Sequence, residues 1–563
     1  MCGFLLYIKK NKSLSKKEIK KINLATELLL HRGPDYKKKI IKKNLFLFHC
    51  RLNIQDLYSR SNQPMIKNID NNKFYLLYNG EIYNFKKIKR NLQKKIKFKT
   101  TGDTEVLLNY LIINKNKFLN YSNLKGMFSF ILLKEKYHNI KIYFARDHFG
   151  QKPLYYLDDD KKIILSSEIK PILSLMKNNS NVNQQICKEY FLKNEYFFQR
   201  KTFFNNINQI LPGECGVITN KKIFFYKYFT KHNILKNNKI TNKVTFLKLF
   251  KKNILEHTIA DKKFAISLSS GIDSQSIAHT LFSNSKVNYE IISYTIDFEN
   301  GTYEFNDAKK FVEAYQKKIK KILITEDFVI NNFEKYVIKN EGPIGGIMLF
   351  GMFKLCETVK KDGFDILFSG FGLDEALGSY KSMRSELITK NKFSLLDNTS
   401  ITNSHYLKNN SFYEDEIRGN YFFKYRIPRS THFMDRVSMS SSIEMRLPFL
   451  DKDFVMNACS INISPNKIDK YLLRNYMQKN SKYKKNWLVP KKHVTHPQNI
   501  WLRSGKLSDF THYILKDKFL YNKYSYLSKT KILNDWIKFK DNQINSGYTF
   551  WQLLNLFFIA KIK

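Results

Sequence analysis

Residues 264–274 read Phe-Ala-Ile-Ser-Leu-Ser-Ser-Gly-Ile-Asp-Ser, and this stretch decides the fold of the second half of the chain. The apolar run predicts a buried strand, and the small residues after it predict a tight loop that opens into a helix. Backbone N–H groups and hydroxyls beside a helix N-terminus can hold phosphate groups. The Gly-Lys-Ser/Thr ending of a Walker A loop is missing, so another kind of phosphate loop is indicated. An ordinary strand–turn–helix connection is the alternative.

A second loop of the same kind follows later in the chain. Residues 366–380 read Ile-Leu-Phe-Ser-Gly-Phe-Gly-Leu-Asp-Glu-Ala-Leu-Gly-Ser-Tyr, an apolar strand that ends in a Gly-rich turn with carboxylates. Strand-like runs at 264–268, 291–296 and 366–368 alternate with helix-length segments, which is typical of a parallel sheet. Ligands bind at the C-terminal ends of such strands, where both loops lie. From about residue 385 to 563 the pattern is mostly helical.

The first half of the chain has a different pattern. Residues 1 to about 225 alternate short β-like runs with turn dipeptides, which predicts a sheet-rich domain with a few helices. A polar stretch at 232–243, rich in Asn and Lys, is interpreted as a linker. The sequence therefore predicts two domains, 2–225 and 245–563. Examples of the expected strands in the first domain are 3–8, 45–48, 74–78, 128–133, 141–145 and 163–166.

Cys2 is the first residue with evident chemistry. Initiator Met is normally removed before a small residue, which would give Cys2 a thiol nucleophile and a free α-amine as internal base. That amine titrates at about pH 8, so it can accept a proton at neutral pH. The alternative is a small buried hydrophobic residue beside a strand.

Several further segments accompany Cys2 and carry a resemblance. They are Leu-Leu-Leu-His-Arg-Gly-Pro-Asp at 28–35, His-Cys-Arg-Leu at 49–52, Asn-Gly-Glu-Ile-Tyr-Asn at 79–84, Thr-Gly-Asp-Thr-Glu at 101–105 and Ala-Arg-Asp-His-Phe-Gly-Gln-Lys-Pro at 145–153. Together with Met-Cys-Gly they resemble the N-terminal-nucleophile glutaminase domain of asparagine synthetases, which are class II amidotransferases. The resemblance implies an α+β domain of layered antiparallel sheets with helices.

The resemblance implies that Cys2 attacks the carboxamide of glutamine. It assigns the oxyanion to the Asn79 side chain and the Gly80 N–H, donors worth about 3 kcal/mol each in such sites. A plain hairpin turn is the alternative for this dipeptide.

The same resemblance assigns the two ends of glutamine to charged residues. Arg51 would bind the α-carboxylate in a bidentate manner, and Asp103 and Glu81 would bind the α-ammonium group. Two positions depart from the family pattern. Cys50 stands where the family usually has a basic residue, and Gly102 where it usually has Ser, but neither change removes a group with an assigned role.

In the second domain the loop at 269–274 resembles the pyrophosphate loop of ATP pyrophosphatases, usually Ser-Gly-Gly-x-Asp-Ser. The loop at 369–375 resembles the Ser-Gly-x-Gly-x-Asp-Glu loop of the synthetases. An ATP-pyrophosphatase-like parallel α/β domain with a helical C-terminal part is implied. Asp273 and Asp374 would bind Mg²⁺ on the pyrophosphate of ATP, since hard oxygen ligands suit that ion. The residues expected to contact the nucleotide are Leu268, Ser269, Ser270, Gly271, Ser274, Ile296, Ser369 and Gly370.

Three segments nearer the C-terminus extend the resemblance. Residues 435–451 contain charges in a partly apolar setting, and residues 470–474 read Lys-Tyr-Leu-Leu-Arg. Residues 490–503 correspond to the segment in which the family carries a Lys that stabilises charge during adenylation. We expect Lys491 in that role, with Lys492 or a surface Lys pair as alternatives. A buried ion-pair network, with catalytic roles as the alternative, is expected for Asp435, Arg436, Glu444 and Arg446.

The resemblance covers nearly the whole chain and implies a ligase with two half-reactions. Glutamine would be hydrolysed through a thioester, and Mg-ATP would activate an acceptor carboxylate as an acyl-adenylate with release of pyrophosphate. Ammonia would then displace AMP after passing through an internal tunnel, lined by an apolar face between the domains. A homodimer is also implied by the resemblance.

The acceptor is less clearly defined. Many asparagine synthetases have Glu where this chain has Phe371, and residues 342–346 read Gly-Pro-Ile-Gly-Gly, a variant found in divergent members. Aspartate is the expected acceptor, with a sugar acid of surface-polysaccharide synthesis as the alternative. A degenerate homologue that binds nucleotide without catalysis is a third reading, and the intact candidate residues speak against it.

Composition sets limits on the remaining functions. The chain has 563 residues and a formal net charge of +48, with 97 Lys+Arg against 49 Asp+Glu. The Lys residues are spread along the whole chain, which favours a compositional bias over a nucleic-acid-binding face. The six cysteines form no CxxC pair, so a reducing, cytoplasmic setting is expected. No apolar run is long enough for a membrane span, and the N-terminus does not look like a signal peptide.

Overall fold

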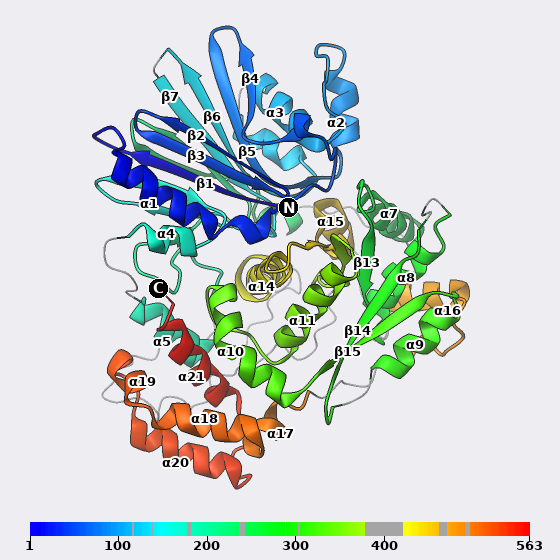
Figure 1. Cartoon of the computed structure of the whole chain (residues 1–563). Helices are drawn as coiled ribbons and strands as arrows, with labels where there is room; N and C mark the ends of the chain where they lie inside the picture. Colours follow the sequence, from blue (N-terminus) through cyan, green and yellow to red (C-terminus); the bar gives the residue numbers. More distant parts are fainter. Residues whose placement is uncertain are drawn as a thin grey trace.

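The computed structural model describes residues 1–114, 117–137, 139–176, 182–194, 196–235, 243–285, 287, 289–301, 304–377, 420–460, 470–489 and 496–562. In Figure 1 the first part of the chain, blue to cyan, forms layered sheets above the second part, which is drawn in green to red. The N-terminus lies where the two parts meet.

Two six-stranded antiparallel sheets form the first part, ordered β10-β8-β9-β1-β3-β2 and β12-β11-β7-β6-β5-β4. Alternate residues of their strands point into a shared interior, where Phe4 and Leu6 meet Leu77, Ile131 and Phe144. The strands are β1 (Cys2–Lys9), β2 (Tyr36–Lys42), β3 (Leu45–Arg51), β4 (Met65–Ile69), β5 (Asn72–Ile82), β6 (Gly126–Lys136), β7 (Asn139–Arg146), β8 (Tyr155–Asp158), β9 (Lys162–Ser166), β10 (Asn208–Gln209), β11 (Glu214–Thr219) and β12 (Lys222–Lys227).

Helices cover the outer faces of these sheets (Figure 1). The first of them begins after Ser15, whose hydroxyl accepts from the Glu18 N–H while Glu18 bonds back to the Ser15 N–H. This reciprocal capping box satisfies two backbone donors at the helix start. These covering helices are α1 (Lys16–Glu27), α2 (Phe85–Leu92), α3 (Asp103–Ile113) and α4 (Lys170–Ser174). Two further helices, α5 (Gln184–Lys193) and α6 (Lys231–Leu235), instead pack against helices of the second part.

A five-stranded parallel sheet forms the centre of the second part, in the order β15-β14-β13-β16-β17. Its strands are β13 (Phe264–Ser267), β14 (Ile292–Phe298), β15 (Lys318–Ile324), β16 (Ile366–Phe368) and β17 (Glu444–Arg446). The helices around it are α7 (Lys243–Glu256), α8 (Ile272–Phe282), α9 (Phe305–Glu313), α10 (Glu326–Asn340), α11 (Met348–Lys361) and α12 (Leu373–Leu377).

The remaining described residues are mostly helical, as the sequence predicts. The last helix is almost wholly buried, and Asn555 in it accepts from the Ile344 N–H at 2.6 Å, so its amide serves an interior contact. These helices are α14 (Ile427–Met439), α15 (Lys452–Cys459), α16 (Tyr471–Asn480), α17 (Gln498–Arg503), α18 (Lys506–Lys516), α19 (Lys518–Lys523), α20 (Lys529–Lys540) and α21 (Tyr548–Ile559). Within the described ranges, no helix combines the length and the apolar character needed to cross a membrane.

The fold class expected from the sequence is confirmed, with antiparallel sheets in the first part and a parallel sheet in the second. The hairpin turn, the alternative for Asn79-Gly80, is excluded, because both residues lie inside β5 and pair with β6. In the expected linker at 232–243, residues 232–235 belong to helix α6, and residues 236–242 lie outside the described part of the chain.

Candidate active site

The pairing of β1 with β3 brings the first two candidate residues together. Cys2 lies opposite Arg51 in the antiparallel register, so the thiol and the guanidinium start from adjacent backbone positions. Asn79 reaches them from β5, since its Oδ1 accepts the Cys2 N–H at 3.0 Å. Three segments that are distant in sequence thus meet where Figure 1 marks the N-terminus.

Only one of the two polar atoms of the Asn79 amide, Oδ1, has a hydrogen-bond partner among the described residues. The side chain is fully buried, and its Nδ2 donor has no hydrogen-bond partner among the described residues. A buried donor without a partner is costly, so this group requires an acceptor such as a water molecule, a ligand or a reaction intermediate. Beside it, Gly80 has φ +155, and a Cβ there would lie 2.1 Å from the Met127 carbonyl oxygen. Only glycine fits this position, which keeps the backbone close to the neighbouring strand.

Arg51 is held by oxygen atoms that carry no charge. Its guanidinium donates to Tyr58 O at 3.0 Å, Asn62 Oδ1 at 2.9 Å, Gln55 O at 3.0 Å and Asp56 O at 2.6 Å. No carboxylate within the described ranges lies at ion-pair distance from it, and burial lowers the pKa of Arg51. An incoming carboxylate would supply the missing negative charge.

Two buried carboxyl groups lie near this guanidinium. Asp103, at the start of α3, accepts from the Tyr78 hydroxyl at 2.7 Å and the Ile82 N–H at 2.9 Å, and burial raises its pKa to about 6. Burial, together with the nearby Glu444 carboxylate, raises the pKa of Glu81 well above its usual range. Buried acids with raised pKa values gain from a cationic partner, which is what an ammonium group offers.

The second part of the chain also reaches this site. Glu444 of β17 lies 3.5 Å from the Met1 amine and 2.8 Å from Arg446 Nε. Burial raises the pKa of the Cys2 thiol, and the N-terminal ammonium group opposes that effect. The sequence indicated Glu444 as part of an ion-pair network, but not that it would lie beside the N-terminus.

Close packing explains why Cys50 stands where the family usually has a basic residue. Its thiol donates to Leu29 O at 3.2 Å, and a Cβ on Gly3 would lie 2.9 Å from its sulfur. A Cβ on Gly33 would lie 2.4 Å from the Cys50 carbonyl oxygen. Because the Cys50 side chain is fully buried, a longer basic side chain at this position would have to displace these close neighbours. At the other departure, Gly102 is the N-cap of α3 without a side-chain cap, and the neighbouring Thr101 N–H is instead bonded to Asp56 Oδ2 at 2.8 Å.

The loop after β13 is organised by serine hydroxyls. The Ser269 N–H donates to Ser274 Oγ at 3.0 Å, and the Gly271 N–H donates to Ser269 Oγ at 3.1 Å. The Ser270 hydroxyl bonds to Glu304 Oε1 at 2.8 Å. These contacts shape the compact turn that precedes α8, as the sequence motif predicts.

The loop after β16 lies directly against this turn. A Cβ on Gly370 would be 2.8 Å from the Ser274 nitrogen, so the two loops approach at backbone contact. The preceding Ser369 N–H donates to Arg446 O at 3.1 Å. At the neighbouring strands, Leu268 is buried and its N–H donates to Tyr294 O at 2.8 Å. Ile296 lies on β14, so the predicted nucleotide contacts share one edge of the sheet.

Lys470 joins the two candidate metal ligands and was not assigned a role from the sequence. Its ammonium group lies 2.7 Å from Asp273 Oδ1 and 2.5 Å from Asp374 Oδ1. Burial raises the pKa of Asp273 to about 6, and the Lys470 charge opposes that rise. No group of three or more His, Cys, Asp or Glu side chains within the described ranges is placed to hold a metal ion alone. The predicted Lys491 lies outside the described residues.

The two carboxylates nevertheless fit a magnesium ion that is carried by a nucleotide. Mg²⁺ is usually held by one or two carboxylates together with phosphate oxygens and water, rather than by a cage of protein ligands. Asp273 and Asp374 converge on one cation in this structure, the Lys470 ammonium. They are therefore the residues that would hold Mg²⁺ here.

The expected ion-pair network is confirmed at the contact between the two parts. Arg32 donates to Asp435 Oδ2 at 2.9 Å and to Glu168 Oε1 at 2.9 Å. Arg436 lies 2.6 Å from Glu341 Oε2. All five side chains are nearly inaccessible to solvent, so each charge depends on its partners.

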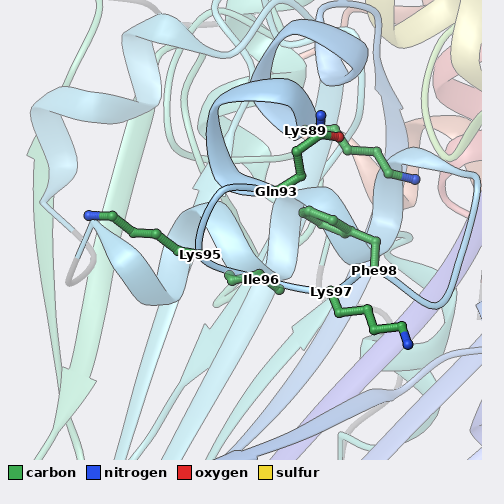
Figure 2. A pocket seen from close by; sticks show the side chains of 6 residues that line it. All are labelled: Lys89, Gln93, Lys95, Ile96, Lys97 and Phe98. Carbon is green, nitrogen blue, oxygen red and sulfur yellow. The ribbon is translucent and has the colours of Figure 1, made fainter.

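An open surface pocket of about 590 Å³ lies apart from these sites. It is formed at the end of α2 and in the following segment, and Figure 2 shows Lys95 and Lys97 extending in different directions. Lys89 there donates to Thr100 O at 2.8 Å. Surface lysines of this kind do not converge on a common point, so we assign the pocket no role in the chemistry.

Comparison with known proteins agrees with this architecture. A family model described as "Glutamine amidotransferase domain" matches residues 1–229, and one described as "Asparagine synthase" matches residues 245–561. The first match identifies the class, the glutamine amidotransferases. The second covers more than half of the chain, and the chain belongs to the asparagine synthase family.

Individual relatives are similar at modest identity. Asparagine synthetase (glutamine-hydrolyzing) 3 of Bacillus subtilis is 24% identical over 81% of this chain and 80% of its own length. Asparagine synthetase (glutamine-hydrolyzing) of Gallus gallus is 26% identical over 92% of this chain and 87% of its own. Amidase chry2 of Gibberella zeae is 25% identical over 67% of this chain, and this match spans only 58% of the amidase.

Proposed function

We propose that this protein is a glutamine-hydrolysing ligase that converts aspartate to asparagine with consumption of ATP. The observation that carries the proposal is the buried, unpaired Asn79 Nδ2 donor beside Cys2. It supports an oxyanion site in the first part of the chain. In the second part, the serine-rich turn after β13 and the Gly370 loop after β16 lie against each other. Domains 2–225 and 245–563 would carry out the two half-reactions.

In the first half-reaction Cys2 attacks the glutamine carboxamide. Its own α-amine, freed by removal of Met1, takes the thiol proton and returns it to the leaving ammonia. Asn79 Nδ2 and the Gly80 N–H stabilise the oxyanion. Water then hydrolyses the thioester to glutamate.

Substrate glutamine is held by its two charged ends. Arg51 receives the α-carboxylate, because its charge has no carboxylate partner in the described part of the chain. Asp103 and Glu81 receive the α-ammonium group, which favours the ionised form of acids whose pKa values are raised by burial.

In the second half-reaction the serine-rich turn and the Gly370 loop hold the phosphates of ATP. Asp273 and Asp374 would hold Mg²⁺, and the ion would neutralise charge on the phosphates of bound ATP. The Lys470 ammonium, which lies against the same two carboxylates, would add a second positive charge beside the phosphates. We also propose that Lys491 offsets charge at the α-phosphate while the acceptor carboxylate becomes an acyl-adenylate.

Ammonia must then cross from the first part to the second without being protonated by bulk water. A small enclosed cavity between the parts is lined by residues of both, including Gln151 and Lys152 on one side and Thr431 and Met445 on the other. Burial lowers the pKa of Lys152. The ammonia path is therefore proposed to run through a contact surface that contains buried polar groups as well as the expected apolar ones.

The acceptor assignment has one competitor. Phe371 replaces the family Glu and is partly buried against the hydrophobic core, so the charge expected near an attacked aspartyl-adenylate is missing at that position. Another carboxylate, such as a sugar acid, is the second candidate. The similarity to a protein named as an amidase agrees with diversity of substrates among relatives.

Product analysis tests the proposal directly. Purified protein is incubated with ATP, Mg²⁺, glutamine and aspartate, and asparagine, glutamate, AMP and pyrophosphate are measured together. Asparagine formed in step with AMP supports the aspartate assignment, and Cys2→Ala removes only the glutamine-dependent part. Glutamate without asparagine or AMP refutes aspartate as acceptor and directs the screen to sugar acids. A complete lack of turnover favours a degenerate homologue.

Two further properties are part of the proposal. All six cysteines have free thiols, which agrees with a reducing, cytoplasmic setting. A homodimer is proposed from the family resemblance, and light scattering of the purified protein tests it.

A further inference from the structure

The loop at 52–62, which follows β3, is bonded to the second part of the chain. The Asp56 N–H donates to Asp261 Oδ2 at 2.8 Å, and the Asp261 N–H donates to Ile54 O at 2.9 Å. Asp261 belongs to residues 257–261, here called the bridging segment, which connects α7 to β13. These two hydrogen bonds fix the loop at two positions from outside its own domain.

The same loop determines where the Arg51 guanidinium lies. Three of the four bonds to the guanidinium come from backbone carbonyls of this loop, those of Gln55, Asp56 and Tyr58. A guanidinium has a planar, fixed arrangement of donors, so its orientation follows the positions of its acceptors. A displacement of the loop would therefore turn or shift Arg51.

Asp56 is the point where these contacts meet. Its φ is +47, a left-handed conformation that few L-residues adopt but that Asp tolerates. Its carboxylate accepts from the Thr101 N–H at 2.8 Å and from Arg60 Nε at 2.9 Å. Thr101 lies two residues before Asp103, so Asp56 links the groups proposed for both ends of glutamine.

The bridging segment is itself firmly held. Arg446 donates to His257 O and, at 2.9 Å, to Ile259 O. The His257 ring lies against Tyr83 with a centroid separation of 3.8 Å. The segment leads after Asp261 into β13, the strand that ends at the serine-rich turn. It can therefore serve as a fixed support for the 52–62 loop.

We propose that Asp261, in the synthetase part, is a positioning residue for glutamine recognition in the glutaminase part. It holds the Asp56 N–H, and through it the loop carbonyls that orient Arg51. This inference rests on the proposed function, because it takes Arg51 as the group that receives the glutamine carboxylate. It predicts that glutamine affinity depends on a residue outside the glutaminase domain.

The test compares three full-length variants in two assays. Asp261→Ala is expected to raise KM for glutamine about tenfold, the effect of losing one hydrogen bond to a charged group. The kcat for glutamine hydrolysis should stay within about twofold, because no group that contacts the reacting atoms is removed. Asparagine synthesis from ammonium salts should be unchanged. Asp261→Asn should restore KM, since its amide oxygen accepts the same N–H.

Lys263→Ala is the matched control, because this exposed residue lies just beyond the bridging segment. It should leave all parameters unchanged. Should Asp261→Ala not fold, Asp261→Ser, with a shorter side chain that also lacks the carboxylate, takes its place. An unchanged KM, an equal defect in Asp261→Asn, or a parallel loss of ammonia-dependent synthesis would overturn the positioning role.

Arg51→Ala distinguishes a failure of the positioning role of Asp261 from a failure of the proposed role of Arg51. If it raises KM for glutamine and Asp261→Ala does not, only the positioning role is refuted. If Arg51→Ala leaves KM for glutamine unchanged, the proposed role of Arg51 fails, and the inference about Asp261 fails with it.

Discussion

Replacement of Asn79 by Ala is the sharpest test of the glutaminase site. Asn79 makes one hydrogen bond, from the Cys2 N–H to Oδ1 at 3.0 Å, and its Nδ2 donor is unpaired within the described ranges. If Nδ2 serves the oxyanion, its removal affects the transition state more than the bound substrate. The lost Oδ1 acceptor lowers the stability of the folded protein and also releases the Cys2 nitrogen, the proposed internal base.

The two effects have different magnitudes. Loss of one oxyanion donor costs about 2.7–4 kcal/mol in the transition state, which is a fall of about 10²- to 10³-fold in kcat for glutamine hydrolysis. Leaving the buried Cys2 N–H without an acceptor costs about 1–3 kcal/mol of stability. KM for glutamine should change little, because Asn79 contacts neither charged end of the substrate in the proposed complex.

The assay follows glutamate release and, separately, synthesis driven by ammonium salts. The ammonia route should keep its wild-type rate. Asn84→Ala is the matched control, because it also loses side-chain amide bonds, an exposed one to Asn123 O and a half-buried one from the Lys125 N–H, without contact to Cys2. A fall in kcat of less than about tenfold, or an equal loss in the ammonia route, would refute the oxyanion role.

Three further predictions concern the rest of the molecule. Gly370→Ala places a Cβ 2.8 Å from the Ser274 nitrogen, so the loop after β16 must move away from the loop after β13. ATP-dependent synthesis should then fall about 10- to 100-fold. Assays with glutamine and with ammonium salts check this, and retained synthesis would contradict it. Glutamine hydrolysis by the same variant should persist. Because the Asp103 pKa of about 6 lies above the usual carboxyl value, the group loses its charge as pH falls through 6, and KM for glutamine should rise about tenfold between pH 7 and pH 5. A flat KM profile over that range would exclude Asp103 as the ammonium partner. Arg436→Met leaves the buried Glu341 carboxylate without its closest partner, 2.6 Å away, and should lower the free energy of unfolding by about 3 kcal/mol in urea titrations. A change below about 1 kcal/mol would show that the remaining partners of Glu341 suffice.

Local sequence patterns were sufficient for the strands named from the sequence and for the two loops with phosphate-loop character. The continuous apolar runs of β1 and β13 are properties of consecutive residues, and pleating translates them directly into strands that are buried on both faces. The Ser-Ser-Gly-Ile-Asp-Ser turn was predictable for the same reason, because its hydroxyls bond within a few residues of themselves.

Local patterns do not decide where one segment fits two structures. Asn79-Gly80 is typical of a hairpin turn, yet it continues β5 because β6 pairs with both residues. The polar composition at 232–235 is typical of a linker, and these residues form part of the short helix α6. Pairing with a strand far along the chain decided the conformation of Asn79-Gly80 among those that the local sequence allows.

The sequence by itself determined the family, the fold class and the set of residues that could perform the chemistry. The tertiary structure decided which of them meet. Lys470 reaches Asp273 across 197 positions, Arg32 reaches Asp435 across 403, and Asp56 reaches Asp261 across 205. Such pairs have no local signature, because they depend on sheet order and helix packing rather than on residue spacing. The support of the 52–62 loop by the bridging segment could therefore be found only in the folded chain.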